Sequence, residues 1–353
     1  MLWIRKLVLP SVESSHTRKD DMYHSDKLKD IANENFGVSY KHAPITLPSH
    51  HVDRIVVCKD VNFSYDKYVI YFNGNNSLFQ LKHRFKEICE IAEGLDVQVI
   101  AFNYRGVGKS TGRINCAKDL IDDGILQVQL LLNADVPPEN IALVGHSLGG
   151  GIATITAEHF ISQGIMLSIF NSRSFASLTH AATHILPSGL KADMLYRIRS
   201  SKVYRLMFNN FIARFFGNII HYLFSVPAYF VISSVFKLSN WEMNSVKAFK
   251  KIPPKYKYGI YVASLDSEHG EYRHVDDEVI MFEASLAKAL GGIDKTDKDI
   301  AKHRLERVRT KESWLPGHDV PFVHLYSVHD KNRHAKDILF NFLRECLRLE
   351  EVK

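Results

Sequence analysis

Short apolar runs alternate with amphipathic segments along most of the chain. Runs rich in β-branched and aromatic residues, which are typical of buried strands, occur at residues 55–58, 68–72, 97–102, 141–144, 165–170 and 258–263. Apolar residues with helical spacing occupy residues 78–92, 120–132, 152–161 and 337–349. We expect the first of these helices to end at Gly94, because glycine readily adopts the left-handed conformation found just after many helices. Because strands that alternate with helices form parallel sheets, the pattern predicts the α/β class, with a mostly parallel central sheet and helices on both faces.

The alternation is interrupted between residues 188 and 255, where an apolar and aromatic stretch from Phe211 to Phe236 follows a basic segment. The stretch is long enough to span a membrane, but Arg214 and Pro227 interrupt it. We therefore interpret it as a helical cap over a pocket, with an interfacial membrane-docking element or a true membrane span as alternatives. The domains expected are an N-terminal extension over 1–37, a core formed by 38–187 and 256–353, and the cap over 188–255.

The composition adds a globular class and a mild positive charge to this picture. The 353 residues are 46% hydrophobic and 24% charged, which is enough apolar material for one large core with an insertion. The formal net charge of +6 favours contact with an anionic surface, and it is too small for a chain of this length to indicate a nucleic-acid-binding protein. The first ten residues lack the pattern of a cleaved signal peptide. The cysteines lack the spacing of a disulfide framework or a zinc site and suit a reducing compartment; they are Cys58, Cys89, Cys116 and Cys346.

One glycine-flanked serine supplies a candidate chemistry. Ser147 follows the apolar run 141–144, lies two residues from both Gly145 and Gly149, and precedes a helix that begins with small residues. This order is typical of a nucleophile elbow, in which a strained turn between a strand and a helix exposes the serine hydroxyl. Such triplets also arise by chance, so the prediction rests on the surrounding turn, strand and helix. Ser147 is therefore the candidate nucleophile.

A reactive serine needs a histidine as base and an acid that orients the histidine. His318 lies late in the chain in a loop punctuated by glycine and proline, which makes it the candidate base, with His324 and His329 as alternatives. The acid is expected after the strand at 258–263, although aspartates there also suit helix capping. The candidate acids are Asp277, which we prefer, Asp276 and Asp266.

Charge that develops on the substrate oxygen is best stabilised by backbone amides that are already in place. The amide of Leu148, directly after the serine, supplies one donor. The second is expected in the segment after the strand at 68–72, where Gly74 permits a tight turn and the amide of Asn75 points inward. This mechanism requires no metal and no organic cofactor.

Four segments together resemble the α/β-hydrolase superfamily. They are Gly145–Gly150, Asn103–Ser110, Asn73–Asn75 and Gly317–His318. The resemblance covers residues 50–345 and implies a serine hydrolase whose lid is inserted between the sixth and seventh strands. The eighth strand of the family is expected to be missing, because the charged stretch Lys302–Lys311 stands in its place before His318.

A narrower resemblance rests on two further segments. Asn103–Gly106, together with Asp119–Gly124, is similar to the SidB-type lipase-like proteins of intracellular bacterial pathogens. This resemblance implies an effector that is delivered into a host cell without a cleaved signal peptide and acts in the cytoplasm or another reducing compartment.

The sequence therefore predicts a serine hydrolase that cleaves a carboxylic ester, with a lipid-like acyl group, through an acyl-enzyme intermediate. The aromatic cap favours an apolar substrate and a peripheral contact with an anionic membrane surface. One alternative is a hydrolase fold that has lost catalysis and serves as a binding or scaffold protein. A remote alternative is a nucleotide hydrolase, since Gly106–Thr111 imitates a P-loop, but Asn103 stands where the first glycine of that motif belongs and Gly112 where a helix should begin.

Overall fold

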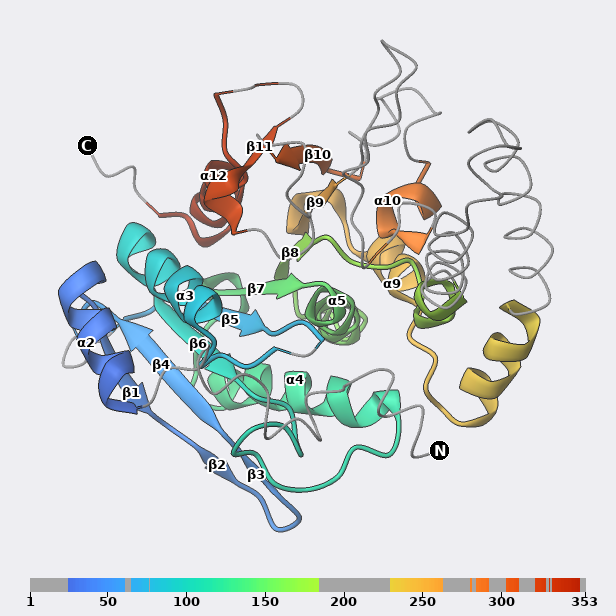
Figure 1. Cartoon of the computed structure of the whole chain (residues 1–353), viewed down its shortest axis with the longest axis horizontal. Coiled ribbons are helices and arrows are strands. Elements are labelled where there is room, and N and C mark those ends of the chain that lie inside the picture. The colour runs from blue at the N-terminus through green and yellow to red at the C-terminus, as the bar shows by residue number, and fades with distance from the viewer. Residues whose placement is uncertain are drawn as a thin grey trace, which may run out of the picture.

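A mixed β-sheet organises the chain. The computed structural model describes residues 25–60, 65–75, 77–183, 229–262, 280, 284–291, 303–310, 321–327, 330 and 332–349. Within these residues the main sheet has nine strands in the order β1-β4-β6-β5-β7-β8-β9-β10-β11 (Figure 1). The six strands from β6 to β10 are parallel to one another, whereas β1, β4 and β11 are antiparallel to their neighbours. The strands are β1 Ser39–His42, β4 Arg54–Cys58, β5 Tyr68–Phe72, β6 Gln98–Phe102, β7 Ile141–His146, β8 Ser168–Ser172, β9 Lys257–Val262, β10 Leu305–Thr310 and β11 Leu325–Ser327.

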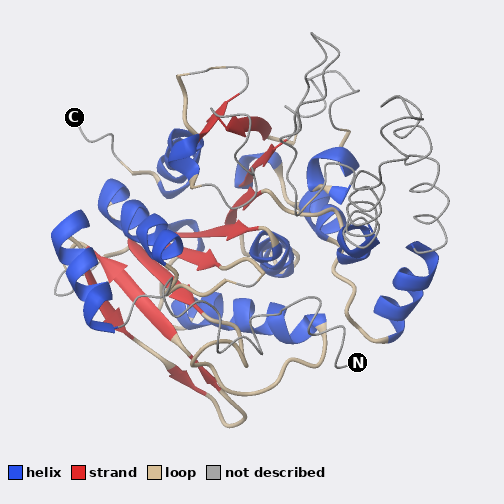
Figure 2. Ribbon diagram, viewed as in Figure 1, coloured by secondary structure: helices blue, strands red, loops and turns tan. Residues whose placement is uncertain are grey.

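Helices cover both faces of this sheet, as the alternation of strands and helices predicts (Figure 2). One face packs against α2 (Ser25–Phe36), α3 (Lys82–Leu95) and α12 (Ala335–Leu347). The opposite face packs against α4 (Ala117–Leu132) and α5 (Leu148–Ile161). Shorter elements are the β2–β3 hairpin (Ile45–Thr46 and His51–Val52), α9 (Ser245–Lys251), α10 (Leu286–Ala289), and the 3-10 helices η3 (Pro138–Asn140), η4 (Pro254–Tyr256) and η6 (Phe322–His324).

The central strands are buried on both faces, which explains their unbroken apolar runs. All six residues of β7 are buried, and Leu143 and Val144 enter the cores on opposite sides of the sheet. Because the strands from β6 to β10 are parallel, their carboxyl ends all lie at one edge of the sheet. This edge carries the loops in which the candidate site residues were expected.

The prediction that α3 ends at Gly94 is wrong. The helix continues to Leu95, and Asp96 adopts the left-handed conformation at its end, with a φ of 54°. Gly94 has a packing role instead, since a Cβ atom there would lie 2.4 Å from Cε2 of Phe340 on α12. The glycine therefore allows the close approach of two helices that cover the same face.

The prediction that the eighth strand is missing is also wrong. Residues Leu305–Thr310 form β10, which pairs in parallel with β9. The apolar residues of this strand, Leu305 and Val308, are buried. The charged Glu306 is accommodated because its carboxylate accepts a hydrogen bond of 2.8 Å from the Tyr258 hydroxyl. Arg333 pairs with the same carboxylate at 3.4 Å. These partners, distant in the sequence, satisfy a charged side chain within the strand.

The described part of the predicted cap consists of residues 229–255. A helix over 229–238 contributes the buried Phe236 to the core cluster that also contains residues of α4 and α5, and the carbonyl of Phe236 accepts a hydrogen bond of 2.8 Å from the N–H of Trp241. The carbonyl of Asn240 accepts a hydrogen bond of 3.0 Å from the N–H of Ala117 at the start of α4. None of the helices in the described ranges is long and apolar enough to cross a membrane. The division into extension, core and cap stays a prediction, although the described helix α2 buries Leu28 and Ala32 against the sheet.

Candidate active site

Ser147 occupies the sharp turn between β7 and α5. The strand ends at His146, the helix begins at Leu148, and the serine between them has φ 54° and ψ −120°. This left-handed region is unfavourable for a residue with a side chain, so the turn stores local strain of the kind found at functional sites. The N–H of Ser147 donates to the carbonyl of Ser172 at the end of β8, at 2.9 Å. Neighbouring strands thus hold the serine in its strained conformation.

The two glycines that flank the serine are required by close backbone contacts. A Cβ atom on Gly145 would lie 2.4 Å from the carbonyl oxygen of Gly149, so the strand and the helix approach each other more closely than side chains permit. A Cβ atom on Gly149 would lie 2.2 Å from the carbonyl oxygen of Phe72 at the end of β5. The sequence motif therefore corresponds to a geometric requirement of this turn.

The loop after β5 lies directly against the serine. We call residues 73–79 the β5 loop; within it, Asn76 lies outside the described residues. A Cβ atom on Gly74 would lie 3.4 Å from Cβ of Ser147 and 3.2 Å from Cδ2 of His146. Asn75 follows as an exposed residue. The structure thus places Gly74 against Ser147, while Asn75 and Leu148 directly follow these two residues in the chain.

The helix α5 contributes its own electrostatics at this point. The first N–H groups of a helix have no acceptor within the helix, and they carry the positive end of its dipole. Leu148 is the first residue of α5, while the N–H groups of Gly150 and Gly151 donate to the carbonyl of Ser147 at 3.0 and 3.3 Å. A negative charge beside the serine hydroxyl is therefore favoured.

The expected base and acid lie outside the described residues. This applies to His318, to the alternative base His329, and to the three candidate acids Asp277, Asp276 and Asp266. The strands that precede them are described: β9 ends at Val262 and β10 ends at Thr310. Both are parallel to β7, so the chain leaves them at the same sheet edge as Ser147. The alternative base His324 is exposed at the end of η6.

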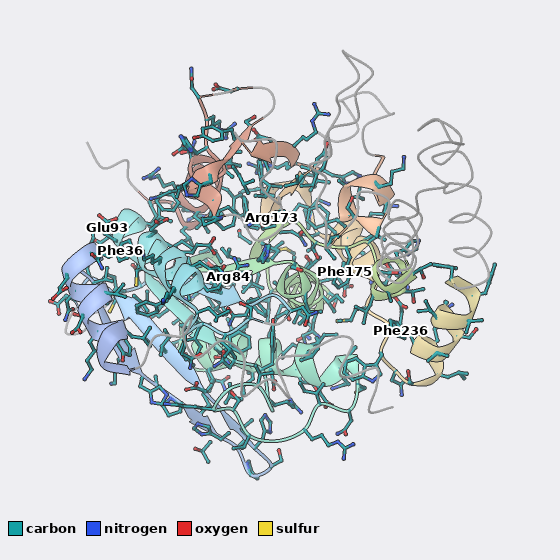
Figure 3. The ribbon with its side chains drawn as sticks, viewed as in Figure 1. Phe36, Arg84, Glu93, Arg173, Phe175 and Phe236 are labelled. Atoms are coloured by element: carbon teal, nitrogen blue, oxygen red, sulfur yellow. The ribbon has the colours of Figure 1, made fainter. Side chains whose placement is uncertain are left out.

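A buried arginine next to the elbow escaped the sequence analysis. Arg173 directly follows β8, has a φ of 52°, and is 1% exposed. Figure 3 shows Arg173 in the interior of the molecule. Its Nε donates to Oγ of Ser172 at 3.1 Å, and its guanidinium lies 5.4 Å from the ring centre of Phe322. The residue links the end of β8 to η6. No sequence signal distinguishes such an arginine from a surface one, because its burial depends on contacts with distant segments.

The segment that imitates a P-loop has a different structure. Gly106 and Gly108 have φ values of 69° and 58°, and no helix follows Lys109 directly, since α4 begins only at Ala117. Oγ of Ser110 donates to the carbonyl of Asn103 at 2.8 Å and thus serves the turn itself. The loop lacks the helix N-terminus that cradles phosphate in nucleotide hydrolases.

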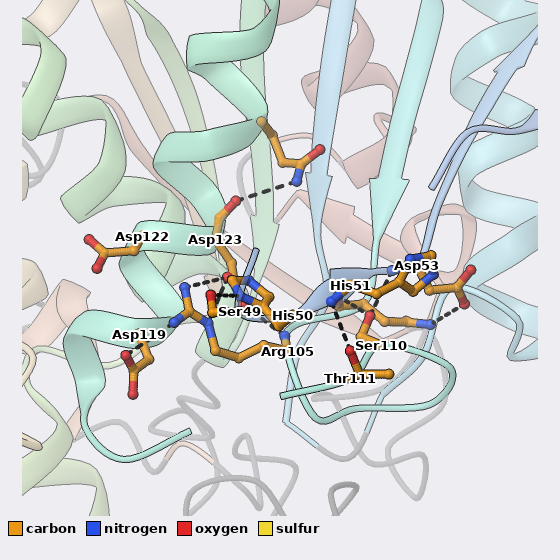
Figure 4. Close-up of polar contacts among 12 residues, drawn as sticks. Ser49, His50, His51, Asp53, Arg105, Ser110, Thr111, Asp119, Asp122 and Asp123 are labelled. Atoms are coloured by element: carbon orange, nitrogen blue, oxygen red, sulfur yellow. Dashed lines mark hydrogen bonds and ion pairs between the residues drawn. The ribbon is translucent and has the colours of Figure 1, made fainter. Parts of the chain in front are cut away.

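The same loop is bound to the start of α4 through charged groups (Figure 4). The guanidinium of Arg105 lies 2.7 Å from Oδ1 of the buried Asp123 and 3.2 Å from Oδ1 of Asp119. The N–H of Arg105 also donates to Asp123, and Nε2 of His50 lies 3.4 Å from that carboxylate. The two segments that carried the narrower resemblance are therefore in direct contact.

Two of the four cysteine thiols are held in their protonated form by burial. Burial raises the pKa of the Cys89 thiol, and it raises the pKa of Cys346 to about 12. Both thiols are therefore protonated at neutral pH and weakly reactive. All four cysteines are free of disulfide bonds.

Comparison with known proteins identifies the fold. A family model described as the alpha/beta hydrolase fold matches residues 70–202, which include the β5 loop, the elbow and α5. The crystal structure of an alpha-beta hydrolase from Vibrio vulnificus superposes with a TM-score of 0.52, covering 90% of this chain and 88% of that one at 16% sequence identity. The chain has the α/β-hydrolase fold. The narrower resemblance to SidB-type proteins stays a prediction.

One curated relative of this α/β hydrolase is the monoglyceride lipase of the mouse. The two proteins are 30% identical over 130 residues, which is 35% of this chain. The aligned part spans 43% of the length of the mouse lipase. The comparisons thus establish the fold, while substrate and activity have to be argued from the site.

Proposed function

We propose that this α/β hydrolase is a serine hydrolase that cleaves carboxylic esters, with Ser147 as the nucleophile. The observation that carries the proposal is the left-handed backbone of Ser147, held between β7 and α5 with Gly74 packed against it. A strained conformation at a non-glycine residue persists only where the surrounding structure enforces it, and such residues cluster at active sites. The geometry is that of a nucleophile elbow.

In the proposed reaction, Ser147 attacks the acyl carbonyl while His318 takes the hydroxyl proton. A bond forms between Oγ and the carbonyl carbon, and the carbonyl electron pair moves to the oxygen. When the tetrahedral intermediate collapses, the carbon–oxygen ester bond breaks and His318 returns the proton to the departing alcohol. Water then repeats the sequence on the acyl-enzyme and releases the acid. Asp277 is proposed to orient His318, with Asp276 and Asp266 as alternatives.

The oxyanion of each tetrahedral intermediate is proposed to receive hydrogen bonds from the N–H groups of Leu148 and Asn75. Two observations support this assignment. Leu148 is the first residue of α5, so its N–H is not used by the helix, and Gly74 brings the β5 loop to the serine. The loss of one such donor commonly lowers kcat by about 10²–10³-fold.

A lipid-like acyl substrate at an anionic surface is the proposed substrate class. The helix over 229–238 exposes three large apolar side chains, namely Phe230 (66% exposed), Val231 (63%) and Leu238 (83%), beside the exposed Lys237. Apolar and basic groups on one short helix suit peripheral contact with anionic lipid. The name of the similar mouse protein, monoglyceride lipase, is consistent with such a substrate.

A fluorophosphonate probe tests the proposed nucleophile. The wild-type protein should be labelled at Ser147, and Ser147→Ala should abolish both labelling and hydrolysis of p-nitrophenyl esters. A folded wild-type protein that resists the probe would instead favour the scaffold alternative. A series of p-nitrophenyl esters from acetate to palmitate tests the substrate class, because a preference for acetate with exclusion of long chains would contradict a lipid-like substrate.

A further inference from the structure

We propose that Tyr104 is a positioning residue, which holds the β5 loop so that its N–H groups face the oxyanion. The inference rests on the proposed function and assigns a task to the loop after β6. Tyr104 is 1% exposed, and its hydroxyl donates to the carbonyl of Asn73 at 3.2 Å. Asn73 is the first residue of the β5 loop and directly precedes Gly74. The hydroxyl thus acts one residue away from the contact with Ser147.

The neighbouring residue Asn103 holds the other end of the same loop. Its Oδ1 accepts a hydrogen bond of 3.2 Å from the N–H of Phe79. Between these two bonds, Gly108 fits closely against the loop, since a Cβ atom there would lie 3.2 Å from Cδ2 of Leu78. Consecutive residues of one turn therefore bind both ends of the β5 loop.

This turn is itself firmly held. Nδ2 of Asn103 donates to Oδ2 of the buried Asp53 at 3.2 Å, and the N–H of Asn103 donates to the carbonyl of Asp53 at 2.9 Å. The N–H of Asp53 donates to Oγ of Ser110 at the far end of the turn, at 2.8 Å. Together with the ion pairs of Arg105, these bonds make the turn a rigid support. A rigid support is what a positioning residue needs.

The chemistry of the Tyr104 hydroxyl suits this task. The ring packs edge-on against Phe102 with centroids 5.3 Å apart, which fixes the direction of the hydroxyl. Burial raises the pKa of Tyr104 well above its ordinary value, so the group stays a hydrogen-bond donor throughout the working range of a hydrolase. It acts through the carbonyl of Asn73.

The test compares Tyr104→Phe with Tyr68→Phe. Tyr68 is a matched control, because its hydroxyl also donates to a main-chain carbonyl, that of Tyr65, at 2.9 Å, but at the opposite end of β5. For each protein we would measure kcat and KM for p-nitrophenyl butyrate and the second-order rate of fluorophosphonate labelling. All rates are normalised to the amount of labelled Ser147, so that unfolded protein does not contribute.

The expected result is a roughly tenfold loss of kcat and of the labelling rate in Tyr104→Phe, with KM within about twofold of wild type. Tyr68→Phe should match the wild type. Normal kcat in Tyr104→Phe, a loss confined to KM, or equal losses in both variants would overturn the inference. If the wild type is not labelled at Ser147, the proposed function itself fails, and the inference fails with it.

Discussion

Gly149 and Phe72 meet through their backbones: a Cβ atom on Gly149 would lie 2.2 Å from the carbonyl oxygen of Phe72. This contact joins the first turn of α5 to the end of β5, where the β5 loop begins. Gly149 lies in a helix and Phe72 in a strand, so neither backbone can shift easily to make room for a side chain. The glycine therefore fixes the distance between the elbow and the loop.

The first prediction is that Gly149→Ala destabilises the protein by about 3 kcal/mol or more, because the new methyl group has to displace either the helix or the strand. It should also abolish labelling of Ser147 by a fluorophosphonate. Gly164→Ala is the control: Gly164 has a φ of 83° but no atom within 4 Å of its Cβ position, so it reports backbone strain alone. We expect Gly164→Ala to lower the free energy of unfolding, measured by urea denaturation, by about 1 kcal/mol and to leave labelling of Ser147 normal. Equal losses of the free energy of unfolding in both variants would contradict the explanation that the new methyl group clashes with Phe72.

A second prediction concerns the ion pair that connects the loop after β6 with α4. The Asp123 side chain is 0% exposed and that of Arg105 is 16% exposed. Asp123→Asn should therefore lower the free energy of unfolding by about 3 kcal/mol, since a largely buried arginine loses its main partner.

The control for this pair is Asp122→Asn, on the same helix. Asp122 pairs with Lys118, whose side chain is 75% exposed. Its removal should change the free energy of unfolding by less than about 0.5 kcal/mol, because exposed pairs of this spacing contribute little. If both substitutions have the same effect, the Arg105–Asp123 pair does not stabilise the fold as argued.

The third prediction is a pH dependence caused by Lys257. Burial lowers the pKa of Lys257 to about 8, although its ammonium donates to the carbonyl of Phe249 at 2.6 Å. The unfolded chain has the ordinary, higher lysine pKa, so between about pH 8 and 10.5 it binds more protons than the folded chain. Stability contributed at this site therefore rises with pH through this window.

Lys257→Met isolates the effect from that of other titrating groups. The free energy of unfolding of the wild type minus that of the variant should increase by on the order of 1 kcal/mol between pH 7 and pH 9.5. Urea denaturation at the two pH values measures this difference. A difference that stays constant or decreases would show that the ammonium is not desolvated in the folded protein.

The fourth prediction concerns the acid of the proposed triad. Asp277→Asn should lower kcat by about 10⁴-fold, as expected when a histidine loses the carboxylate that selects its tautomer. Asp276→Asn and Asp266→Asn should retain activity within about tenfold. Steady-state hydrolysis of p-nitrophenyl butyrate, normalised to folded protein, distinguishes the three. If Asp266→Asn or Asp276→Asn has the largest defect, the acid has been assigned to the wrong aspartate.

Much of the core could be predicted from local patterns. The apolar runs at 68–72 and 141–144 are strands because they are buried on both faces, and a continuous apolar run is a direct result of such burial. The glycine before Ser147 is similarly local, since the clash that excludes side chains at Gly145 comes from Gly149, four residues away, whereas Gly149 itself is required by the distant Phe72. Features that depend on residues close together in the chain can therefore be predicted from short sequence patterns.

Other features depend on partners that are distant in the chain. The stretch Leu305–Thr310 is a strand although it is charged, because Tyr258 and Arg333 satisfy Glu306. Asp96 caps α3 in place of Gly94, whose small size serves the contact with Phe340. Neither outcome follows from propensity, since tertiary contacts override it.

The α/β class, the parallel core of the sheet and the turn at Ser147 could be predicted from the sequence alone, because the patterns that indicate them lie in short segments of the chain. Only the tertiary structure decided that Tyr104 contacts Asn73 and that Arg105 joins Asp119 and Asp123. The residues of each contact come from different loops or helices, and only the folded sheet brings their ends together at one edge. A hydrogen bond between such residues has no periodicity and no spacing that a sequence pattern could show.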